Sequence, residues 1–467
     1  MLVESFSGIR GVYNKDFGLD TVRKYAFVFC EMLKEENDKV KVVVGADTRP
    51  SSDEIKKEFI RVFTYNGVDV VDVGINPVQA IENAARVYSA NGGVVVSASH
   101  NPPEQNGFKL LDETGAVLEP ERIKEIIRRV HETEIVGKVT GDFRKVLNMH
   151  DDCVEQYLKF VFDIVGKDNT NLIKEFKTRI LFDPNGGAAC AVIPKLIERL
   201  GLDAEVINKR PGVFSRAIEP DENSLGGLMM VVKRENFHFA IAFDCDADRG
   251  EFVLDGKIMS GHYALALVVD DFLSGMKNPE KQIIVVNDAT SGVVREVASR
   301  HGAMVKEVEV GEINIVKEME RNNSLVGGEG SSNGVIYSPS KCRDSILTLV
   351  LILKIMAKKN KRLKDLINQM PRYFTVAAKV VCSPEKHKEI RKRLKDVFAR
   401  ERYQIQETGT DGGLKVYFSE KAWLWFRASK TEAGVYRVIA DSPYEEESKR
   451  LLREGVFVLN QIEKQIK

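Results

Sequence analysis

The sequence of 467 residues lacks several features that would assign it quickly to a protein class. Its six cysteines include no C-x-x-C pair, which argues against a zinc site or a disulfide framework and favours free thiols in a reducing compartment. No apolar run approaches the roughly 20 residues of a membrane-spanning helix. The first residues lack the basic and apolar regions of a secretory signal. We therefore expect a cytoplasmic protein that has no membrane partner.

The chain also has no net charge, because 69 lysines and arginines balance 69 aspartates and glutamates. A protein that is drawn to nucleic acid or anionic lipid by its overall field carries a basic excess, so nucleic acid is not expected as a partner. Histidine is scarce, with seven residues and no H-x-x-x-H metal pair. What is present is an ordinary hydrophobic content of 43% in a chain too long for one core, which predicts several globular domains.

Three stretches repeat a pattern of apolar strand, turn with an aspartate, helix, glycine and second strand. They read KVVVGADTRPSSDEIKKEFIRVFTYNGVDVVDVG, RILFDPNGGAACAVIPKLIERLGLDAEVIN and QIIVVNDATSGVVREVASRHGAMVKEVEVG. This order predicts parallel crossover units, and the glycine after each helix suits a C-terminal cap. The run AKKNKRLKDL at 357–366 reads as a connection, and beyond it short strands surround one helix before a last helix ends near Lys464.

The predicted fold class is therefore α/β, with three tandem α/β domains followed by a smaller C-terminal α+β domain. We place the domains at residues 1–150, 151–255, 256–365 and 366–467.

Residues 93–111, GVVVSASHNPPEQNGFKLL, pose the first question about function. An apolar strand ends at Ser97-Ala98-Ser99-His100, and two prolines follow before the turn pair Asn106-Gly107. Turns require Asn, Gly and Pro but not Ser-x-Ser-His, so a plain turn and a loop with a nucleophilic serine both remain open. Neighbours on an extended chain point in opposite directions, which favours a hydrogen-bonding role for His100 over that of a base for Ser99.

The stretch HFAIAFDCDADRGEFVLDG places Asp244, Asp246 and Asp248 on a loop between two strands. Three adjacent carboxylates repel one another unless a cation gathers them, and their hard oxygens suit Mg²⁺ or Ca²⁺. An EF-hand is excluded because its loop requires Gly at the position of Arg249 and Glu at that of Asp255. A solvated acidic turn is the alternative. Next to a metal, the Arg249 guanidinium can hold a phosphate oxygen.

Two further loops offer polar groups to a ligand. The glycine-rich LVGGEGSSNGVIY lies between predicted strands and suits sugar hydroxyls, with a mobile turn as the alternative. RASKTEAGVYR combines cations, hydroxyls and backbone N–H groups, which can cradle a phosphate without a Walker motif. FSGIRGVY places Arg10 in a turn flanked by glycines. The candidate residues of LVGGEGSSNGVIY are Glu329 and Ser331. Those of RASKTEAGVYR are Arg427, Ser429, Lys430 and Thr431.

Together these loops resemble the α-D-phosphohexomutase family over nearly the whole chain. SASHNPPEQNGFK, DCDADR, GGEGSSNG and RASKTEA occur in the order and spacing of that family, and FSGIRG, GADTR and EPDENSLGGL resemble further stretches of it. The branch with the greatest similarity contains archaeal-type phosphomannomutases, phosphoglucomutases and phosphoglucosamine mutases. The resemblance implies four domains, with mixed sheets in the three α/β domains, around a central cleft to which each contributes one loop.

The resemblance also implies an activity, the interconversion of hexose 1-phosphate and hexose 6-phosphate through a phosphoserine and a hexose 1,6-bisphosphate, which is also the activator. Mannose, glucose and glucosamine phosphates are the candidate substrates. The implied metal is Mg²⁺, held by Asp244, Asp246, Asp248 and phosphorylated Ser99. The implied catalytic residues are Ser99, Lys109, Arg10 and Arg249, the sugar-binding residues are Glu329 and Ser331, and the phosphate-binding residues are Arg427, Ser429, Lys430 and Thr431.

The chain departs from the family pattern at several of these positions. Ser97 stands where the family has Thr, Cys245 replaces a usual Gly, and the sugar loop ends in Ser-Asn-Gly where many members have Ser-Gly-His. The last change leaves the preferred hexose and the general base open, and Glu312 in VGEIN is one candidate base. A phosphoserine phosphohydrolase and a non-catalytic sugar-phosphate sensor are the alternative functions. Monomer and homo-oligomer both remain open.

Overall fold

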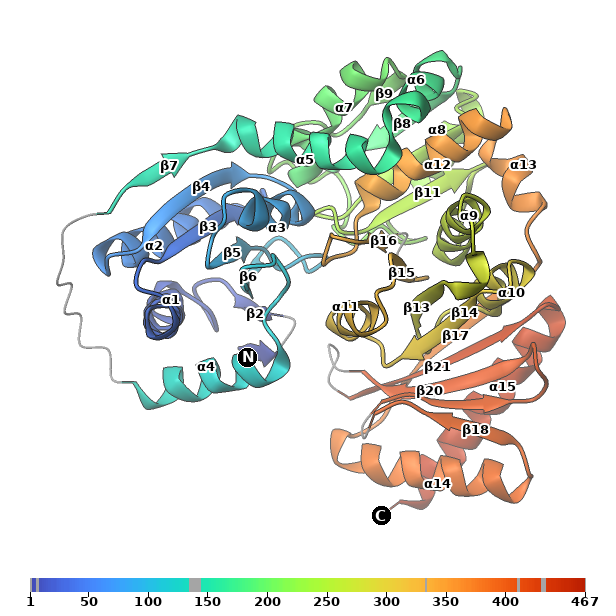
Figure 1. Ribbon diagram of the computed structural model, residues 1–467. Helices are drawn as coiled ribbons and strands as arrows, with labels where there is room; N and C mark the ends of the chain where they lie inside the picture. Colours follow the sequence, from blue (N-terminus) through green and yellow to red (C-terminus); the bar gives the residue numbers. More distant parts are fainter. Residues whose placement is uncertain are drawn as a thin grey trace. The chain divides into compact units, whose positions relative to one another are not determined.

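The computed structural model describes residues 2–5, 8–133, 144–331, 334–409, 412–429 and 434–466. The chain forms two compact units. Unit 1 contains Met1–Met259 and Ile336–Leu363, and unit 2 contains Ser260–Val335 and Lys364–Lys467. Four β-sheets with their helices follow one another along the chain (Figure 1).

The first sheet has seven strands in the order β1-β2-β6-β5-β3-β4-β7. Strands β5, β3, β4 and β7 run parallel, whereas β1, β2 and β6 join through antiparallel pairs. The sheet is therefore mixed. Its strands are β1 (Val3–Ser5), β2 (Gly8–Val12), β3 (Lys41–Ala46), β4 (Asp69–Ile75), β5 (Gly92–Val96), β6 (Gln105–Leu111) and β7 (Val146–Asn148), and the accompanying helices are α1 (Leu19–Glu36), α2 (Ser52–Tyr65), α3 (Val78–Val87) and α4 (Pro120–Glu132).

Helices on both faces explain the unbroken apolar sequence of β3. Val42 and Val44 point into a core formed with α1, α2 and α4. Gly45 points to the opposite face, where a Cβ atom would meet the Ile81 side chain of α3 at 2.6 Å. Because successive side chains of a strand alternate between faces, a central strand covered on both sides must be apolar throughout.

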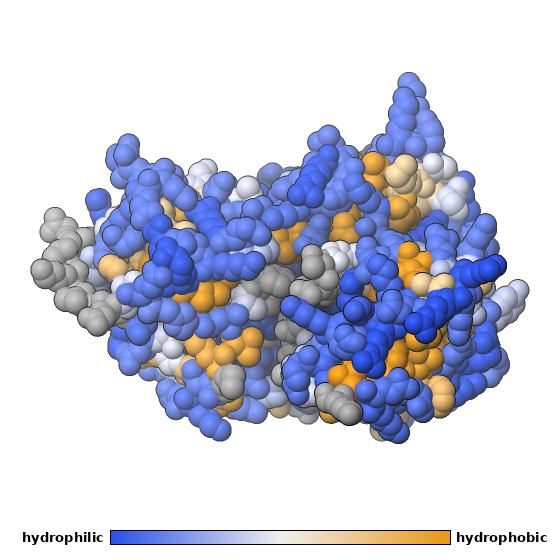
Figure 2. Space-filling view, turned by 90° about the horizontal axis from the view of Figure 1, so that it is seen from below, coloured by the Kyte–Doolittle hydropathy of each residue, from blue (hydrophilic) through white to orange (hydrophobic). Residues whose placement is uncertain are grey.

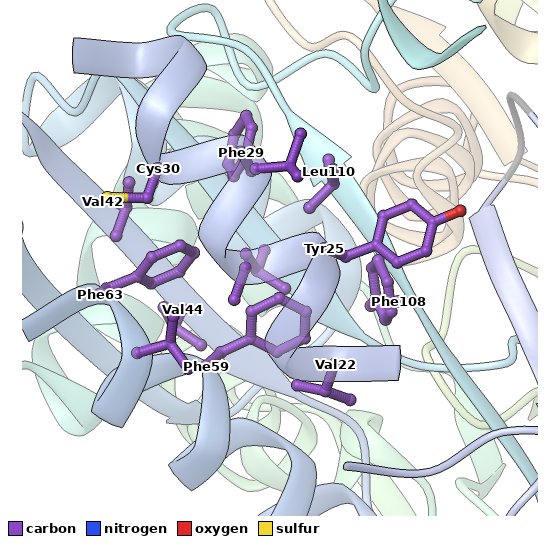
Figure 3. Close-up of a cluster of buried hydrophobic side chains, with 14 of the residues drawn as sticks. Val22, Tyr25, Phe29, Cys30, Val42, Val44, Phe59, Phe63, Phe108 and Leu110 are labelled. Carbon is purple, nitrogen blue, oxygen red and sulfur yellow. The ribbon is translucent and has the colours of Figure 1, made fainter. Parts of the chain in front are cut away.

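Aromatic rings fill the core between α1, α2 and the sheet (Figure 3). The ring of Phe59 on α2 meets that of Phe108 on β6 edge to face, with centroids 4.9 Å apart. Phe108 also contacts Tyr25 on α1, at 5.2 Å between centroids. This packing anchors β6, the strand that carries Lys109.

The second sheet has five strands in the order β12-β11-β10-β8-β9 and is also mixed. Helix α12 packs against helices α5 and α6. The strands are β8 (Arg179–Asp183), β9 (Asp203–Val206), β10 (Phe239–Phe243), β11 (Gly250–Leu254) and β12 (Lys257–Ile258). The helices are α5 (His150–Val165), α6 (Lys167–Glu175), the 3₁₀ helix η1 (Ala188–Ala191), α7 (Ile193–Leu200), α8 (Gly226–Arg234) and α12 (Ser345–Lys359).

The third sheet has the order β14-β13-β15-β16, with β13 parallel to both of its neighbours. Its strands are β13 (Ile283–Asn287), β14 (Met304–Val308), β15 (Val326–Glu329) and β16 (Gly334–Tyr337). The helices in this part of the chain are α9 (Gly261–Ser274), the 3₁₀ helix η2 (Pro279–Lys281), α10 (Gly292–Arg300), α11 (Glu312–Arg321) and, further on, α13 (Leu363–Asn368).

The fourth sheet is antiparallel throughout, in the order β17-β21-β20-β19-β18. Helices α14 and α15 contact its strands and share their hydrophobic core. The strands are β17 (Phe374–Val381), β18 (Gln404–Glu407), β19 (Leu414–Tyr417), β20 (Trp423–Ala428) and β21 (Val435–Ser442). The helices are the 3₁₀ helix η3 (Pro384–Lys386), α14 (His387–Arg400) and α15 (Glu445–Gln465). The predicted fold class is confirmed, whereas the four domain boundaries stay predictions.

Local predictions were right for most elements and wrong at three places. Gly67, Gly201 and Gly302 all adopt positive φ after their helices, as helix ends favour. The Asn106-Gly107 pair lies within β6 and is not a turn, and Arg10 lies within β2. The connection predicted at 357–366 is partly helical, because α12 and α13 extend into it.

Figure 2 shows one face of the molecule, on which hydrophilic residues predominate and hydrophobic side chains lie in small groups between them. Among the described residues, no helix combines the length and hydrophobicity that crossing a membrane requires. All six cysteines are described, and none forms a disulfide.

Phe59→Ala should weaken unit 1 because it removes a fully buried ring that packs against Phe63 and Phe108. We expect a loss of about 3–5 kcal/mol in the free energy of unfolding, the usual cost of such a cavity. Urea unfolding followed by circular dichroism measures it. Phe59→Leu, which keeps most of the volume, should lose less, and equal stability of Phe59→Ala and the wild type would contradict the packing described.

Candidate active site

Ser99 lies in a loop at the end of β5 in a strained backbone conformation. Its φ angle is +53°, a left-handed value that residues with a Cβ atom adopt only when their surroundings enforce it. The Ser97 hydroxyl accepts a hydrogen bond from the Ser99 N–H at 2.8 Å. The Arg49 guanidinium donates to the carbonyl oxygens of Ser99 and Asn101, at 2.7 and 2.6 Å. Both contacts fix the loop around Ser99.

Arg49 is itself held by a buried ion pair with Asp47. The Asp47 carboxylate also accepts hydrogen bonds from the Arg49 N–H at 3.0 Å and from Ser52 at 2.6 Å. Strands β3 and β5 are parallel neighbours, so the turn after β3 and the loop after β5 meet at the same edge of the sheet. The GADTR motif was recognised in the sequence, but Arg49 was not singled out as a site residue.

Asp244, Asp246 and Asp248 occupy the loop between β10 and β11, as predicted. Their side chains are buried, and one carboxylate oxygen from each lies within 4.8 Å of the others. Ala247 has φ +60° and lies in a bend between the last two aspartates. Buried Oδ1 atoms of Asp246 and Asp248 accept no hydrogen bond from any described residue. Buried oxygens in this state are suitable ligands for a hard cation.

The backbone of this acidic loop is held by elements from other parts of unit 1. The Val78 N–H at the start of α3 donates to the carbonyl oxygen of Asp246 at 3.0 Å. The Ala247 carbonyl oxygen accepts from Gln79 Nε2 at 2.9 Å and from Ser345 Oγ, at the start of α12, at 2.7 Å. Three helix-start residues therefore fix two carbonyl groups, which aims the aspartate side chains.

The serine loop and the acidic loop meet in unit 1. Ser99 Oγ donates a hydrogen bond to Asp244 Oδ2 at 3.3 Å, and Ser97 Oγ donates to Asp246 Oδ2 at 3.0 Å. On the neighbouring strand β6, Lys109 Nζ lies 3.4 Å from Asp246 Oδ2. Residues more than 130 positions apart in the sequence thus form one buried cluster.

Cations surround the three aspartates. Arg343 Nη2 donates to Asp248 Oδ2 at 2.7 Å, a contact that sequence analysis missed. Arg249 Nη1 donates to Glu219 Oε1 at 3.2 Å, and the backbone N–H of Arg249 donates to Asp244 Oδ1 at 3.3 Å. Glu219 belongs to the EPDENSLGGL stretch noted in the sequence.

Arg10 lies close to the same charges. Burial lowers the pKa of the Arg10 guanidinium, while the negative charges of Asp246 and Asp248 oppose that shift. Arg10 pairs with Gly107 across β2 and β6, where a Cβ atom would meet Arg10 Cγ at 2.8 Å. The glycine therefore leaves room for the Ile9 carbonyl oxygen, 2.2 Å from that Cβ position, and for the arginine side chain.

The aspartates differ in their electrostatic surroundings. Burial, with repulsion from Asp246 and Asp248, raises the pKa of Asp244 well above its usual value. Burial alone would also raise the pKa of Asp248, but the positive charges of Arg343 and Lys109 lower it below its usual value. The charge of Asp244 thus needs compensation more than that of Asp248 does.

His100 is neutral at physiological pH. Its Nδ1 atom lies 3.5 Å from Ser99 Oγ. Burial and the neighbouring arginines lower the pKa of His100 to about 2. The imidazole can thus exchange a hydrogen bond with the serine but carries no charge there, in line with the hydrogen-bonding role expected for it.

Glu329 ends β15 in unit 2 and is 8% exposed. Its Oε1 atom accepts hydrogen bonds from Asn287 Nδ2 at 3.2 Å and from the Gly311 N–H at 3.0 Å. Gly330 lies against the His262 ring, where a Cβ atom would meet Nδ1 at 2.1 Å. Ser331 is exposed, and Asn333 lies outside the described residues. The motif joins two strands, as predicted.

Arg427 lies at the end of β20, also in unit 2, and is 7% exposed. Its Nη2 atom forms an ion pair with Glu309 Oε1 at 3.0 Å. Ser429 follows, and its N–H donates to the Val435 carbonyl oxygen at 2.8 Å. Lys430 and Thr431 lie outside the described residues.

Family models match most of the chain. Their descriptions are phosphoglucomutase/phosphomannomutase, alpha/beta/alpha domain I at residues 4–136, domain II at 155–256 and domain III at 260–373. The chain belongs to this family. It is a phosphohexomutase, an isomerase that interconverts the 1- and 6-phosphates of a sugar. The predicted family and reaction are confirmed, and the alternatives of a phosphohydrolase and a sensor are set aside.

Relatives of this phosphohexomutase align over almost their whole length. A phosphoglucomutase/phosphomannomutase of Thermococcus kodakarensis is 32% identical over 463 residues, 97% of each chain. A phosphoglucosamine mutase of Caldanaerobacter subterraneus is 30% identical over 430 residues, 88% of this chain and 92% of the relative.

Solved structures share the fold at lower identity. A phosphoglucomutase/phosphomannomutase family protein of Burkholderia thailandensis superposes with a TM-score of 0.80 at 21% identity, covering 99% of this chain and 98% of that one. An Aspergillus fumigatus N-acetylphosphoglucosamine mutase, in complex with GlcNAc-6P and magnesium, superposes with a TM-score of 0.56 at 15% identity, covering 83% and 92%.

Gly187→Ala should displace the acidic loop of this phosphohexomutase. A Cβ atom there would lie 2.9 Å from the carbonyl oxygen of Cys245 and 3.0 Å from that of Asp244. Since φ at Gly187 is −78°, alanine adds a steric clash without backbone strain. We expect the affinity for a divalent cation to fall at least about tenfold.

Calorimetric titration with Mg²⁺ and Mn²⁺ tests this expectation. Gly227→Ala is the matched control, because no atom lies within 4 Å of the Cβ position there. Equal affinities in the two variants would show that the loop position does not govern cation binding.

Proposed function

We propose that Ser99 carries the transferred phosphoryl group of this mutase. The observation that supports the assignment is the 3.3 Å hydrogen bond from Ser99 Oγ to Asp244, one of three buried carboxylates that can hold a metal ion. The left-handed backbone at Ser99 and its contacts with Ser97 and Arg49 present the hydroxyl in one orientation. A fixed nucleophile lowers the entropic part of the barrier to group transfer.

Mg²⁺ is the cation that we assign to Asp244, Asp246 and Asp248. The donor set fits it, since all three ligands are carboxylates and two of their buried Oδ1 atoms accept no hydrogen bond from a described residue. The magnesium in the Aspergillus structure supports the choice. When bound, Mg²⁺ draws negative charge from the phosphoryl oxygens. A phosphate on Ser99 would complete its ligands.

Lys109, Arg249 and Arg10 then face the phosphoryl group during transfer. Lys109 is buried and already contacts Asp246, so its ammonium group is placed without further ordering. Burial keeps the three cations from full hydration, which strengthens their attraction for the phosphoryl oxygens. Arg343 holds Asp248 and so positions one of the proposed metal ligands.

Glu329 and Ser331 bind the sugar hydroxyls in this proposal, and Arg427 and Ser429 bind the phosphate that is not being transferred. A carboxylate that already accepts two hydrogen bonds has remaining lone pairs for hydroxyl donors. Lys430 and Thr431 complete the phosphate-binding set from outside the described residues.

The reaction requires two transfers. In the first, a hydroxyl oxygen of the hexose monophosphate attacks the phosphorus of phosphorylated Ser99. The new O–P bond forms as the Oγ–P bond breaks, the hydroxyl proton leaves to a base, and the product is a hexose 1,6-bisphosphate. The bisphosphate then turns and returns its other phosphoryl group to Ser99. Glu312, the first residue of α11, is the candidate base. The same bisphosphate phosphorylates a resting Ser99, and so activates the enzyme.

The substrate is a phosphosugar, and the candidates are the phosphates of glucose, mannose and glucosamine. The Thermococcus and Caldanaerobacter relatives bear names that divide between these sugars, at similar identity. Assaying the purified protein with all three hexose 1-phosphates decides between them. A cytoplasmic location and the oligomeric state stay predictions.

Ser99→Ala should abolish both phosphate incorporation and most of the mutase activity. We expect purified wild-type protein to carry one phosphate on a fraction of molecules, measured by intact mass and by mapping the phosphopeptide. Ser97→Ala is the control, because Ser97 orients the loop and is not the phosphorylated residue in this proposal. It should keep the phosphate and lose only part of the activity. A phosphate that maps to Ser97, or full activity in Ser99→Ala, would overturn the assignment.

A further inference from the structure

Arg427 faces an anion that belongs to the protein itself. In β20, Leu424 and Phe426 point into the core of the fourth sheet, so Arg427 points to the opposite face. There its guanidinium meets the carboxylate of Glu309, with Nη2 and Oε1 3.0 Å apart. The arginine side chain is 8% exposed and that of Glu309 is 19% exposed. This is a largely buried ion pair within unit 2.

Glu309 occupies a loop of three residues, 309–311, between β14 and α11. Asn314 Nδ2 donates to the Glu309 carbonyl oxygen at 3.2 Å, which holds the start of the loop. At its other end, the Gly311 N–H donates to Glu329 at 3.0 Å. The same short loop therefore contacts the glutamate proposed to bind the sugar and the arginine proposed to bind the phosphate.

We propose that Glu309 competes with the substrate phosphate for Arg427 and so limits how tightly the bisphosphate is held. The proposal rests on the assignment of Arg427 as a phosphate-binding residue. Carboxylate and phosphate oxygens both accept charge-assisted hydrogen bonds from a guanidinium, and a phosphate at Arg427 comes close to the Glu309 carboxylate. Repulsion between the two anions lowers the affinity for phosphate.

Competition between Glu309 and the phosphate for Arg427 helps the bound bisphosphate to turn between the two transfers. Each catalytic cycle requires the bisphosphate to release one phosphate from Arg427 and to present the other. Leaving a largely buried guanidinium without a hydrogen-bonded anion is costly, because little water reaches it. Glu309 pairs with Arg427 at that moment and offsets the cost. The phosphate can then leave while the sugar stays bound.

Removing the charge of Glu309 should tighten the binding of a hexose phosphate. We would measure the affinity for glucose 6-phosphate by calorimetry in the full chain carrying Ser99→Ala, which prevents turnover. Glu309→Gln keeps the shape and a neutral hydrogen bond to Arg427, and should tighten binding about tenfold, the effect of one strong charge interaction. Glu309→Ala should also tighten it. Glu320→Gln, which removes a charge from the exposed end of α11, should leave affinity unchanged.

Weaker binding of glucose 6-phosphate by the Glu309 variants would contradict the proposal. If Glu309 merely aligns Arg427 for phosphate, both Glu309 variants will bind glucose 6-phosphate more weakly, and the proposal is wrong. An unchanged affinity contradicts it as well. With Ser99 restored, Glu309→Gln should lower both KM and kcat and release less bisphosphate, whereas a structural defect would raise KM.

Arg427→Ala separates this inference from the function on which it rests. It should weaken binding of glucose 6-phosphate, and adding Glu309→Gln to it should no longer tighten binding. Unchanged affinity in Arg427→Ala would overturn the phosphate assignment and this inference with it. Weaker binding in Arg427→Ala, combined with no tightening in Glu309→Gln, would overturn the competition alone.

Discussion

Mutual repulsion among Asp244, Asp246 and Asp248 is the constraint on which the site depends. Three buried carboxylates with oxygens within 4.8 Å of one another cannot all stay ionised without cations. Lys109 lies against Asp246 and Arg343 against Asp248, and Arg10 and Arg249 add positive charge nearby. Burial, with repulsion from the other two aspartates, nevertheless raises the pKa of Asp244, and it is the carboxylate that the Ser99 hydroxyl contacts. The remaining need for positive charge thus lies beside the proposed nucleophile.

The fold satisfies this constraint by bringing loops of different sheets together within unit 1. Parallel strands place the serine loop and the Asp47 turn at one edge of the first sheet, and the acidic loop joins two strands of the second. The starts of α3 and α12 hold the acidic loop through its carbonyl oxygens. Backbone contacts of this kind fix carboxylates without using the oxygens that a metal needs.

Sequence reasoning predicted those site residues whose pattern lies within a short stretch of the chain. The triad lies in one hexapeptide, and Ser99 follows an apolar strand at once, so both could be recognised. Arg343 could not, because its partner Asp248 is 95 positions away and no local pattern marks the pair. Arg10 was placed in a turn because glycines flank it, yet Gly107 across the strand pair is what makes room for its side chain. The long-range ion pair of Arg427 and Glu309 was equally hidden.

The central claim is most directly tested by the thermal unfolding of Asp244→Asn and Asp248→Asn, each with EDTA and with Mg²⁺. In EDTA, Asp244→Asn should be as stable as the wild type or more so, because it removes a buried charge whose pKa is raised, whereas Asp248→Asn should be less stable, since it removes the carboxylate that Arg343 and Lys109 contact. Mg²⁺ should raise the midpoint of the wild type and of neither variant. A wild type that does not respond to Mg²⁺, together with a destabilised Asp244→Asn in EDTA, would contradict the account.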